Sequence, residues 1–483
     1  MDAKLFKNYL YNMLYQVIRL ILPLFTVAYL YSHVGEATLG INQSVGAIGN
    51  WFVLFGVLGI NVYGNREIAR VRDDREKLSK TFFEIFSMQF LNVLLVSIFY
   101  IVYVILFVKS YLPVWYLFLL TLLASALDIS WLYYGVEDFK SASLRNAFVK
   151  ILGVIMIFVF VKSEDDLLIY VFINAFAELI GQAIMFAQLK KYVDYTKISL
   201  KDAFDHHFVG TLSLFVPTIA IQVYTLLDKT MLATLTTNTA DLEIYATSQS
   251  FVKIFLSFIT SIGSVMLPRV TNAYYNSSDG KEKAADYINI TLKIALMIAI
   301  PMTVALIFVS PYFYPWYLKN SPSAINRSIE LVQWSAPLVI AISISNVFGI
   351  QYLVPTAKTK AYSLSVIVGA CINFVINYFL IPSLGGLGAA IGSIAAEVTV
   401  ALVQYYFVAK EVHFNLGTSI LKYIIGSALM GLTVIYVGNT LGSYIYTNAI
   451  QAIFGALVYA LVLLILKDDL FMTALGKLRH HNG

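Results

Sequence analysis

The chain has 483 residues, of which 59% are apolar and 13% are charged, and its formal net charge is +5 at pH 7. Soluble domains are about 45–50% apolar and about 25% charged, so this composition excludes an ordinary soluble protein. The mean hydropathy of +0.76 indicates a polytopic membrane protein, whose outer surface faces lipid rather than water.

Apolar segments of about 20 residues, long enough to cross a bilayer as helices, follow one another along the whole chain. Basic residues precede the first segment without a small-residue cleavage site, so we expect an uncleaved span. Six spans are predicted before a polar linker, at 9–31, 39–63, 82–108, 114–134, 146–162 and 167–188. Eight follow it, at 208–236, 244–266, 285–309, 328–353, 361–381, 387–409, 419–437 and 447–466. The predicted fold class is therefore all-α, with about 14 transmembrane helices.

Basic residues gather on one side of this predicted topology. Of the 33 Lys and Arg residues, 25 fall in segments expected in the cytoplasm and 4 in segments on the opposite side. Positive charge in short loops marks the cytoplasmic side of a membrane protein. We therefore expect an even number of spans, with both termini in the cytoplasm.

Similar short patterns occur in both halves of the chain. Ala-Glu pairs place Glu178 and Glu397 in the middle of spans 219 positions apart, and Gln-Ser pairs begin at Gln43 and Gln249. These matches predict a six-span unit used twice in the same orientation, a common arrangement in transporters. The expected domains are a six-helix bundle at 1–188, a cytoplasmic linker at 189–207, a second six-helix bundle at 208–409, and two further helices with a tail at 410–483.

Charged residues inside the predicted spans are the main candidates for function, because a charge within a bilayer is costly and is usually compensated or used. Arg19, Glu178, Lys253 and Glu397 are expected near mid-bilayer, Asp128 and Lys293 in the cytoplasmic half, and Asp228 and Lys229 in the outer third. Ion pairs that fix helix packing are the structural alternative for each of them. The functional interpretation is a hydrated cavity that binds an anionic substrate.

Each candidate residue has an expected role. Arg suits phosphate, because its planar guanidinium donates paired hydrogen bonds. The expected substrate-binding residues are Arg19, Lys253, Lys293, Gln43 and Gln249. The candidates for ion coupling are Glu178, Glu397 and Asp128. Asp228, Lys229 and Arg66 are expected to be structural or gating residues, since neighbouring helical residues such as Asp228 and Lys229 point about 100° apart.

Several other features have simple interpretations. A single cysteine, Cys371, excludes an intrachain disulfide. The six histidines lack metal-ligand spacing, and no G-x-x-x-x-G-K-[ST] loop occurs. We therefore expect no enzyme activity, catalytic residue, cofactor, metal or nucleic-acid partner. The basic segment 66–80, REIARVRDDREKLSK, is expected to form an amphipathic helix at the cytoplasmic surface, in contact with membrane lipid.

Five motifs in order along roughly residues 1–410 resemble the Wzx-type polysaccharide flippases of the multidrug/oligosaccharidyl-lipid/polysaccharide exporter (MOP) superfamily. They are YGNREIAR (63–70), WLYYGVEDFK (131–140), LLDKTMLATL (226–235), GIQYLVPTAKTKAYSLSVIVGACINFVINYFLIP (349–382) and GAAIGSIAAE (388–397). The last two predicted spans resemble the family less.

This resemblance implies a flippase in the bacterial plasma membrane. Its substrate would be an undecaprenyl-diphosphate-linked oligosaccharide, moved from the cytoplasmic to the outer leaflet by alternating access through a cationic central cavity. A polysaccharide polymerase is the partner that the resemblance implies.

Three alternatives remain open on the sequence. A drug or cation exporter of the same superfamily would favour an acidic cavity, and a lipid II flippase would also fit fourteen spans. A membrane-embedded polysaccharide polymerase or ligase would need a large external loop with catalytic groups. The longest expected external loop, 310–327, is short and contains no acid or histidine.

Overall fold

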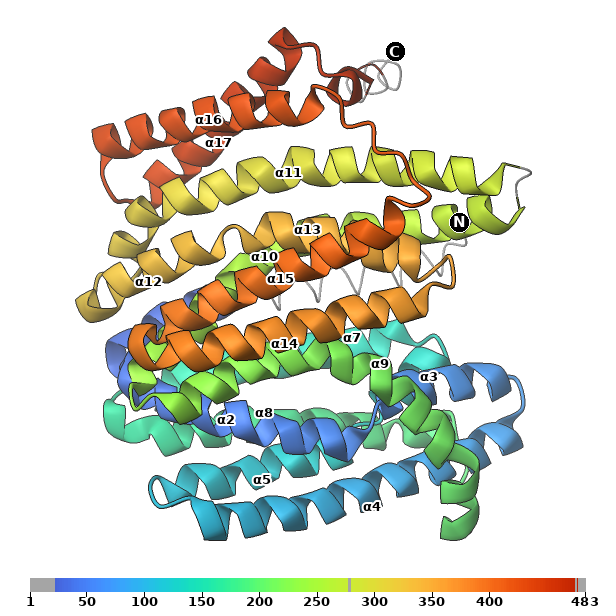
Figure 1. Cartoon of the computed structure of the whole chain (residues 1–483). Helices are drawn as coiled ribbons and strands as arrows, with labels where there is room; N and C mark the ends of the chain where they lie inside the picture. The colour runs from blue at the N-terminus through green and yellow to red at the C-terminus, as the bar shows by residue number, and fades with distance from the viewer. Residues whose placement is uncertain (1–21, 277–278, 474–475, 477–483) are drawn as a thin grey trace. The chain divides into compact units, whose positions relative to one another are not determined.

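A computed structural model describes residues 22–276, 279–473 and 476 of the protein (Figure 1). In these residues the regular elements are helices, and eleven of the described helical segments are long and apolar enough to cross a membrane. The predicted all-α polytopic class is therefore confirmed. The number of fourteen spans and the cytoplasmic location of both termini stay predictions.

The chain divides into two compact units, Met1–Ala233 and Thr234–Gly483. The boundary that we expected from the polar linker lies earlier, at 189–207. Helix α9, Leu200–Leu235, begins inside that linker and falls almost wholly in the first unit. The division into two six-helix bundles and two extra helices stays a prediction.

In the first unit, two of the expected spans are each built from two consecutive helices. Its elements are α2 (Glu36–Val57), α3 (Ile60–Val71), α4 (Arg75–Phe107), α5 (Leu112–Ala126), α6 (Ser130–Gly135), α7 (Phe139–Phe160), η1 (Glu164–Asp166), α8 (Leu167–Ala187), η2 (Leu189–Lys191) and α9. The break between α2 and α3 falls at Leu58 and Gly59, both with left-handed backbone (φ +47° and +75°). At Gly59 a Cβ would lie 3.2 Å from the backbone of Phe215 in α9, so glycine serves both the turn and the close packing.

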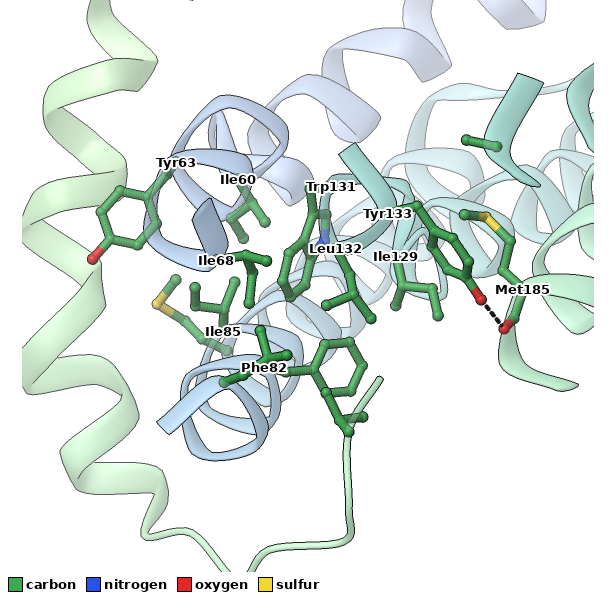
Figure 2. Packing of buried hydrophobic residues seen from close by; sticks show 14 residues of the cluster. Ile60, Tyr63, Ile68, Phe82, Ile85, Ile129, Trp131, Leu132, Tyr133 and Met185 are labelled. Atoms are coloured by element: carbon green, nitrogen blue, oxygen red, sulfur yellow. Dashed lines mark hydrogen bonds between the residues drawn. The ribbon is translucent and has the colours of Figure 1, made fainter. Parts of the chain in front are cut away.

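One of two core clusters among the described residues of the first unit lies where α3, α4 and α6 meet (Figure 2). Trp131 is fully buried against Phe82, and its indole N–H donates to Oε1 of Gln89 over 3.0 Å. The amide nitrogen of Gln89 donates in turn to the carbonyl oxygens of Ser125 and Asp128, at 2.8 and 2.9 Å. These bonds tie α4 to the turn that follows α5.

The second unit begins with two helices of 38 residues each. Its elements are α10 (Thr239–Asn276), α11 (Gly280–Tyr317), α12 (Pro322–Ser335), α13 (Leu338–Phe348), the π-helical turn η3 (Gly349–Leu353), α14 (Thr359–Leu384), α15 (Gly386–Val408), α16 (Ser419–Leu441) and α17 (Ile445–Ile465). Helices α14 and α15 lie side by side, and α16 and α17 pack against α11 (Figure 1).

Small residues set the spacing of these helix pairs. A Cβ on Gly388 would lie 2.6 Å from the carbonyl carbon of Leu380, so α15 touches the backbone of α14 at this point. A Cβ on Gly438 of α16 would lie 2.5 Å from the ring of Tyr312 in α11. Close approach at small residues is the usual basis of helix packing in membranes.

Two expectations about loops were wrong. The segment 66–80 does not form one surface helix, because α3 ends at Val71 and α4 begins at Arg75. Asp74 caps α4 by accepting a 3.1 Å hydrogen bond from the backbone N–H of Lys77, which explains the break. The expected loop 310–327 is also mostly helical, since α11 continues to Tyr317 and α12 begins at Pro322.

Candidate functional site

The predicted substrate-binding residues occupy different helices. Arg19 lies outside the described residues. Gln43 is half-buried in α2 of the first unit. In the second unit, Lys253 is exposed on α10, Lys293 is half-buried on α11, and Gln249 is half-buried on α10.

Three charged side chains of the first unit act electrostatically on Glu178 of α8. Glu178 is exposed on α8, and the charges of Lys150, Asp128 and Arg145 act on it. Two of the predicted ion-coupling residues, Asp128 and Glu178, therefore share one electrostatic environment with two cations. Lys150 and Arg145 both lie within α7. At 1.5 Å per residue, Lys150 is about 17 Å along that helix.

Asp128 also has a local structural role between α5 and α6. Its Oδ1 accepts a 3.0 Å hydrogen bond from the backbone N–H of Ser130 at the start of α6. Its own carbonyl accepts from Gln89. Asp therefore suits this turn independently of any ion coupling.

Asp228 and Lys229 lie where α9 packs against α2. Asp228 is buried and Lys229 is half-buried. The neighbouring Thr230 accepts a 2.8 Å hydrogen bond from the indole N–H of Trp51 and also lies 2.8 Å from the carbonyl oxygen of Ala47. The predicted structural or gating pair is thus next to a polar contact between two helices.

Buried polar residues connect helices inside the second unit. Glu397 of α15 is buried and accepts a 3.1 Å hydrogen bond from the hydroxyl of Ser345 in α13. The amide of Gln249 donates to the hydroxyl of Ser335 in α12 over 2.9 Å. Both predicted residues therefore join neighbouring helices, which keeps the structural interpretation open beside the functional one.

Arg66 belongs to a surface where basic groups already have acidic partners. It lies 2.8 Å from Glu67 and 5.3 Å above the ring of Tyr63. Three further arginines of this region pair with acids: Arg70 with Glu67, Arg72 with Glu137 and Arg75 with Asp194. A neutralised surface of this kind favours a structural role for Arg66 over binding of an anionic head group.

One extensive ion pair of the second unit was not predicted. Arg327 of α12 makes two hydrogen bonds to the buried carboxylate of Asp241 in α10, at 2.7 and 3.2 Å. It also donates to Glu330 over 2.6 Å and to the carbonyl of Leu384 over 2.8 Å. One guanidinium therefore fixes α10, α12 and the end of α14 together.

A second feature that the sequence did not reveal occurs once in each unit. We call it the clasp. It is an ion pair between the residue just before α7 or α14 and a residue three or four positions after the end of α15 or α8. In the first unit Lys191 lies 3.5 Å from Asp138, and in the second unit Lys358 pairs with Glu411. Both pairs combine positions 220 apart, 138 with 358 and 191 with 411, but the charges are exchanged.

The backbone around the two clasps has the same geometry. Glu137 and Ala357 both have left-handed backbone, with φ of +61° and +59°. The next residue in each unit donates its N–H over 2.8 Å to the carbonyl five positions back, the pattern that ends many helices. The only signal in the sequence was the basic residue, Lys190 or Lys410, beside each clasp.

A tyrosine completes each clasp. Tyr192 donates to Asp138 and its ring lies 4.8 Å from the Lys191 ammonium, while Tyr352 donates to Glu411 over 3.0 Å and lies 5.2 Å from Lys358. Burial raises the pKa of Asp138, but hydrogen bonds from Tyr192 and Ser141 outweigh this and hold the pKa below its usual value. Burial also raises the pKa of Glu411, but hydrogen bonds from Lys358 and Tyr352 outweigh this effect, so that its pKa is lowered as well.

The helices define a multi-pass membrane protein with the fold of the MOP superfamily. A structure described as "Lipid II flippase MurJ, inward closed conformation" superposes with a TM-score of 0.75 at 18% identity, covering 95% of this chain and 99% of that one. An inward-facing multidrug resistance MATE family transporter of the MOP superfamily gives a TM-score of 0.64 at 13% identity, with 81% and 94% covered.

Sequence comparison gives the family. A model described as "Polysaccharide biosynthesis protein" matches residues 5–273, more than half of the chain, and a MatE model matches residues 214–379. The chain belongs to the polysaccharide biosynthesis protein family. A "Putative O-antigen transporter" of Escherichia coli (strain K12) is 23% identical over 412 residues, which cover 84% of this chain and 97% of that protein. A protein of the same description from Shigella dysenteriae is 26% identical over 295 residues, covering 58% and 69%.

Proposed function

We propose that this protein is a flippase that moves a diphosphate-linked oligosaccharide lipid from the cytoplasmic to the outer leaflet of a bacterial plasma membrane. The main support is its membership of the polysaccharide biosynthesis protein family together with cations inside its helices. The match to the Escherichia coli O-antigen transporter covers 97% of that protein, and its description fits a lipid-linked saccharide as substrate.

The substrate head carries negative charge that must leave water to cross the membrane. Desolvation of such a charge is costly unless a cation is already in place. Arg19, Lys253 and Lys293 are the proposed ligands of the diphosphate, and Gln43 and Gln249 would bind sugar hydroxyls. Alternating access would expose these residues first to one leaflet and then to the other. We assign the protein no enzymatic step, and a polysaccharide polymerase is its proposed partner.

Net transport of the substrate in one direction requires a source of free energy. A charge that crosses a potential of 100 mV contributes about 2.3 kcal/mol. Glu178, Glu397 and Asp128 are the proposed carriers of the coupling ion. The charges of Asp128, Lys150 and Arg145 that act on Glu178 support a site in the first unit where binding of a proton or cation changes the local charge balance.

A translocation assay tests this function. The full-length protein is placed in proteoliposomes with a fluorescent undecaprenyl-diphosphate oligosaccharide, and the wild type is compared with Arg19→Ala, Arg19→Lys and Lys253→Ala. We expect translocation by the wild type, its loss in Arg19→Ala and partial recovery in Arg19→Lys, because lysine keeps the charge but not the paired donors. Lys109→Ala, in the exposed segment between α4 and α5, is the matched control.

Two further substrates separate the alternatives. Transport of lipid II in preference to the oligosaccharide lipid would favour a lipid II flippase, whose solved example shares the fold at 18% identity. Export of a cationic dye without movement of either lipid would favour a drug exporter and contradict the proposal.

A further inference from the structure

Three buried polar side chains from three helices of the first unit form one chain of hydrogen bonds. The hydroxyl of Tyr63 in α3 lies 2.8 Å from Nδ1 of His207 in α9, and Nε2 of His207 lies 3.0 Å from Oε2 of Glu84 in α4. Each residue is less than a tenth exposed. Figure 2 shows Tyr63 at the edge of the core cluster, with its hydroxyl pointing away from the other labelled residues.

The same positions of the heavy atoms suit two protonation states. With neutral imidazole, His207 donates one N–H to the Glu84 carboxylate and accepts from the Tyr63 hydroxyl. With imidazolium, both ring N–H groups donate, one to the carboxylate and one to the tyrosine oxygen. One proton can therefore be added to the three residues without moving them.

The second carboxylate oxygen of Glu84 is left without a donor. Oε1 is buried and accepts no hydrogen bond from the part of the chain that the structure describes. Lys80 and His206 each approach it only to 3.9 Å. A buried charge that is incompletely paired destabilises the fold, and a proton added to the adjacent His207 makes the Glu84–His207 pair neutral.

Exposed titratable groups connect this site to water. Lys80 and His206, the two groups nearest to Oε1, are 56% and 58% exposed. The charged and titratable groups that face the three residues are Arg66, Glu67 and Arg70 from α3, Lys80 from α4 and His206 from α9. Among the described residues no group of three or more His, Cys, Asp and Glu side chains is arranged to hold a metal ion.

We propose that Glu84, His207 and Tyr63 form a proton-binding site, and that the bound proton strengthens the attachment of α9 to α3 and α4. The site differs from the coupling residues proposed above, and its equilibrium can be measured without any transport substrate. The result of its test is therefore independent of whether the protein is a flippase.

The first experiment is thermal unfolding of the purified full-length protein at several values between about pH 5 and 8, where histidine is the residue type that changes charge. If the folded site binds the proton more tightly than the unfolded chain does, its stabilisation is complete at the acidic end and is lost as the pH rises. We expect His207→Gln and Glu84→Gln to lose most of this pH-dependent shift in unfolding midpoint. His413→Gln, at an exposed histidine of the second unit, should keep it.

A purely structural role predicts a different result. In that case His207→Gln lowers the unfolding midpoint by the same amount at every pH, and the proton-binding site is refuted. The same holds if the wild type and His207→Gln have parallel pH profiles.

A second measurement covers variants that fold poorly. Tyr63→Phe removes only one hydroxyl and keeps the ring in the core. Amide hydrogen exchange in the first turns of α9 is followed at the two ends of the pH range in Tyr63→Phe, Glu84→Gln and the wild type. We expect acid to protect these amides in the wild type, less so in Tyr63→Phe and least in Glu84→Gln, after correction for intrinsic exchange. Equal protection ratios in all three proteins would overturn the proposal.

Discussion

Asp138 in the first unit and Lys358 in the second occupy the same position in a repeated loop and carry opposite charges. Each follows a residue with left-handed backbone and each pairs with the residue 53 positions further on, Lys191 or Glu411. The loop geometry is thus the same in both units although the residues differ. What the two units share is the ion pair itself, independent of which partner is basic.

Exchange of charges within a clasp should therefore be tolerated. Lys358→Glu places two carboxylates together, and we expect it to lower the stability of the second unit by about 1 kcal/mol, the upper range for partly exposed pairs. The double variant Lys358→Glu/Glu411→Lys should recover most of this loss, because it copies the polarity of the first unit. Thermal unfolding of the three proteins measures the effect. A double variant no more stable than Lys358→Glu would show that the pair is specific to its present polarity.

The clasps also predict the acid limit of stability. The pKa values of Asp138 and Glu411 are lowered in the folded protein. Their contribution is therefore present above the ordinary carboxylate values of about 3.9 and 4.3, and it is lost as the pH falls through the lowered values. We expect Lys358→Ala/Glu411→Ala to differ least from the wild type in strong acid and most near neutral pH. A difference that grows on acidification contradicts this assignment.

Contact between α14 and α15 depends on Gly388. Alanine here would place a Cβ 2.6 Å from the backbone of Leu380, which cannot rotate away. We expect Gly388→Ala to destabilise the protein by about 1–3 kcal/mol, the usual range for overpacking. Gly46→Ala is the matched control, since its Cβ would meet its nearest neighbour at 3.7 Å. Alanine at that helical position should be neutral or stabilise by about 0.5–1 kcal/mol.

Loss of Arg327 should destabilise the second unit more than loss of its clasp, the pair of Lys358 and Glu411. Removal of one partner from a fully buried pair costs about 3–5 kcal/mol. Because Arg327 is 27% exposed, we expect a smaller loss of about 2–3 kcal/mol in Arg327→Ala. The stability of Arg327→Lys should fall between those of the wild type and Arg327→Ala, because lysine cannot bind both oxygens of Asp241 in the same plane. Unfolding midpoints give the order, and Glu330→Gln should change them little.

Glu397 provides a test of ion coupling that leaves the fold intact. In Glu397→Gln the amide oxygen can still accept the hydrogen bond from Ser345, so the contact between α15 and α13 is kept. We expect translocation in proteoliposomes to lose its dependence on an imposed proton or cation gradient. Glu330→Gln is the control, since this acid is 43% exposed on α12. Unchanged gradient dependence would assign coupling to another carboxylate.

Apolar length predicted most helices, but not where they break. The expected span 39–63 is one apolar run, yet α2 ends at Val57 and α3 begins at Ile60. The break is tied to the approach of α9, far along the chain, to Gly59. Span 114–134 is divided in the same way around Asp128, where Gln89 of another helix donates to the carbonyl oxygens of Ser125 and Asp128. Tertiary contacts of this kind leave no periodic signal in the sequence.

The polar contacts were predicted less well for the same reason. Glu84 stands in the apolar run FFEIFSMQF, which marks it as unusual, but its partner His207 lies 123 positions away. Lys150 falls inside the expected span 146–162, but α7 begins eleven residues before it, at Phe139, so the helix starts well before the apolar run. Charge inside a span is therefore visible in sequence, and its partner is not.

The position of α9 affects how the first unit is made. A membrane protein is synthesised from its N-terminus, and its early helices enter the bilayer before later ones exist. Here the interior carboxylate of Glu84 and the backbone at Gly59 await His207 and Phe215, which are synthesised only after the first six predicted spans. Until then the nascent first unit exposes an incomplete face, and translation must continue to about Ala233 before it can close.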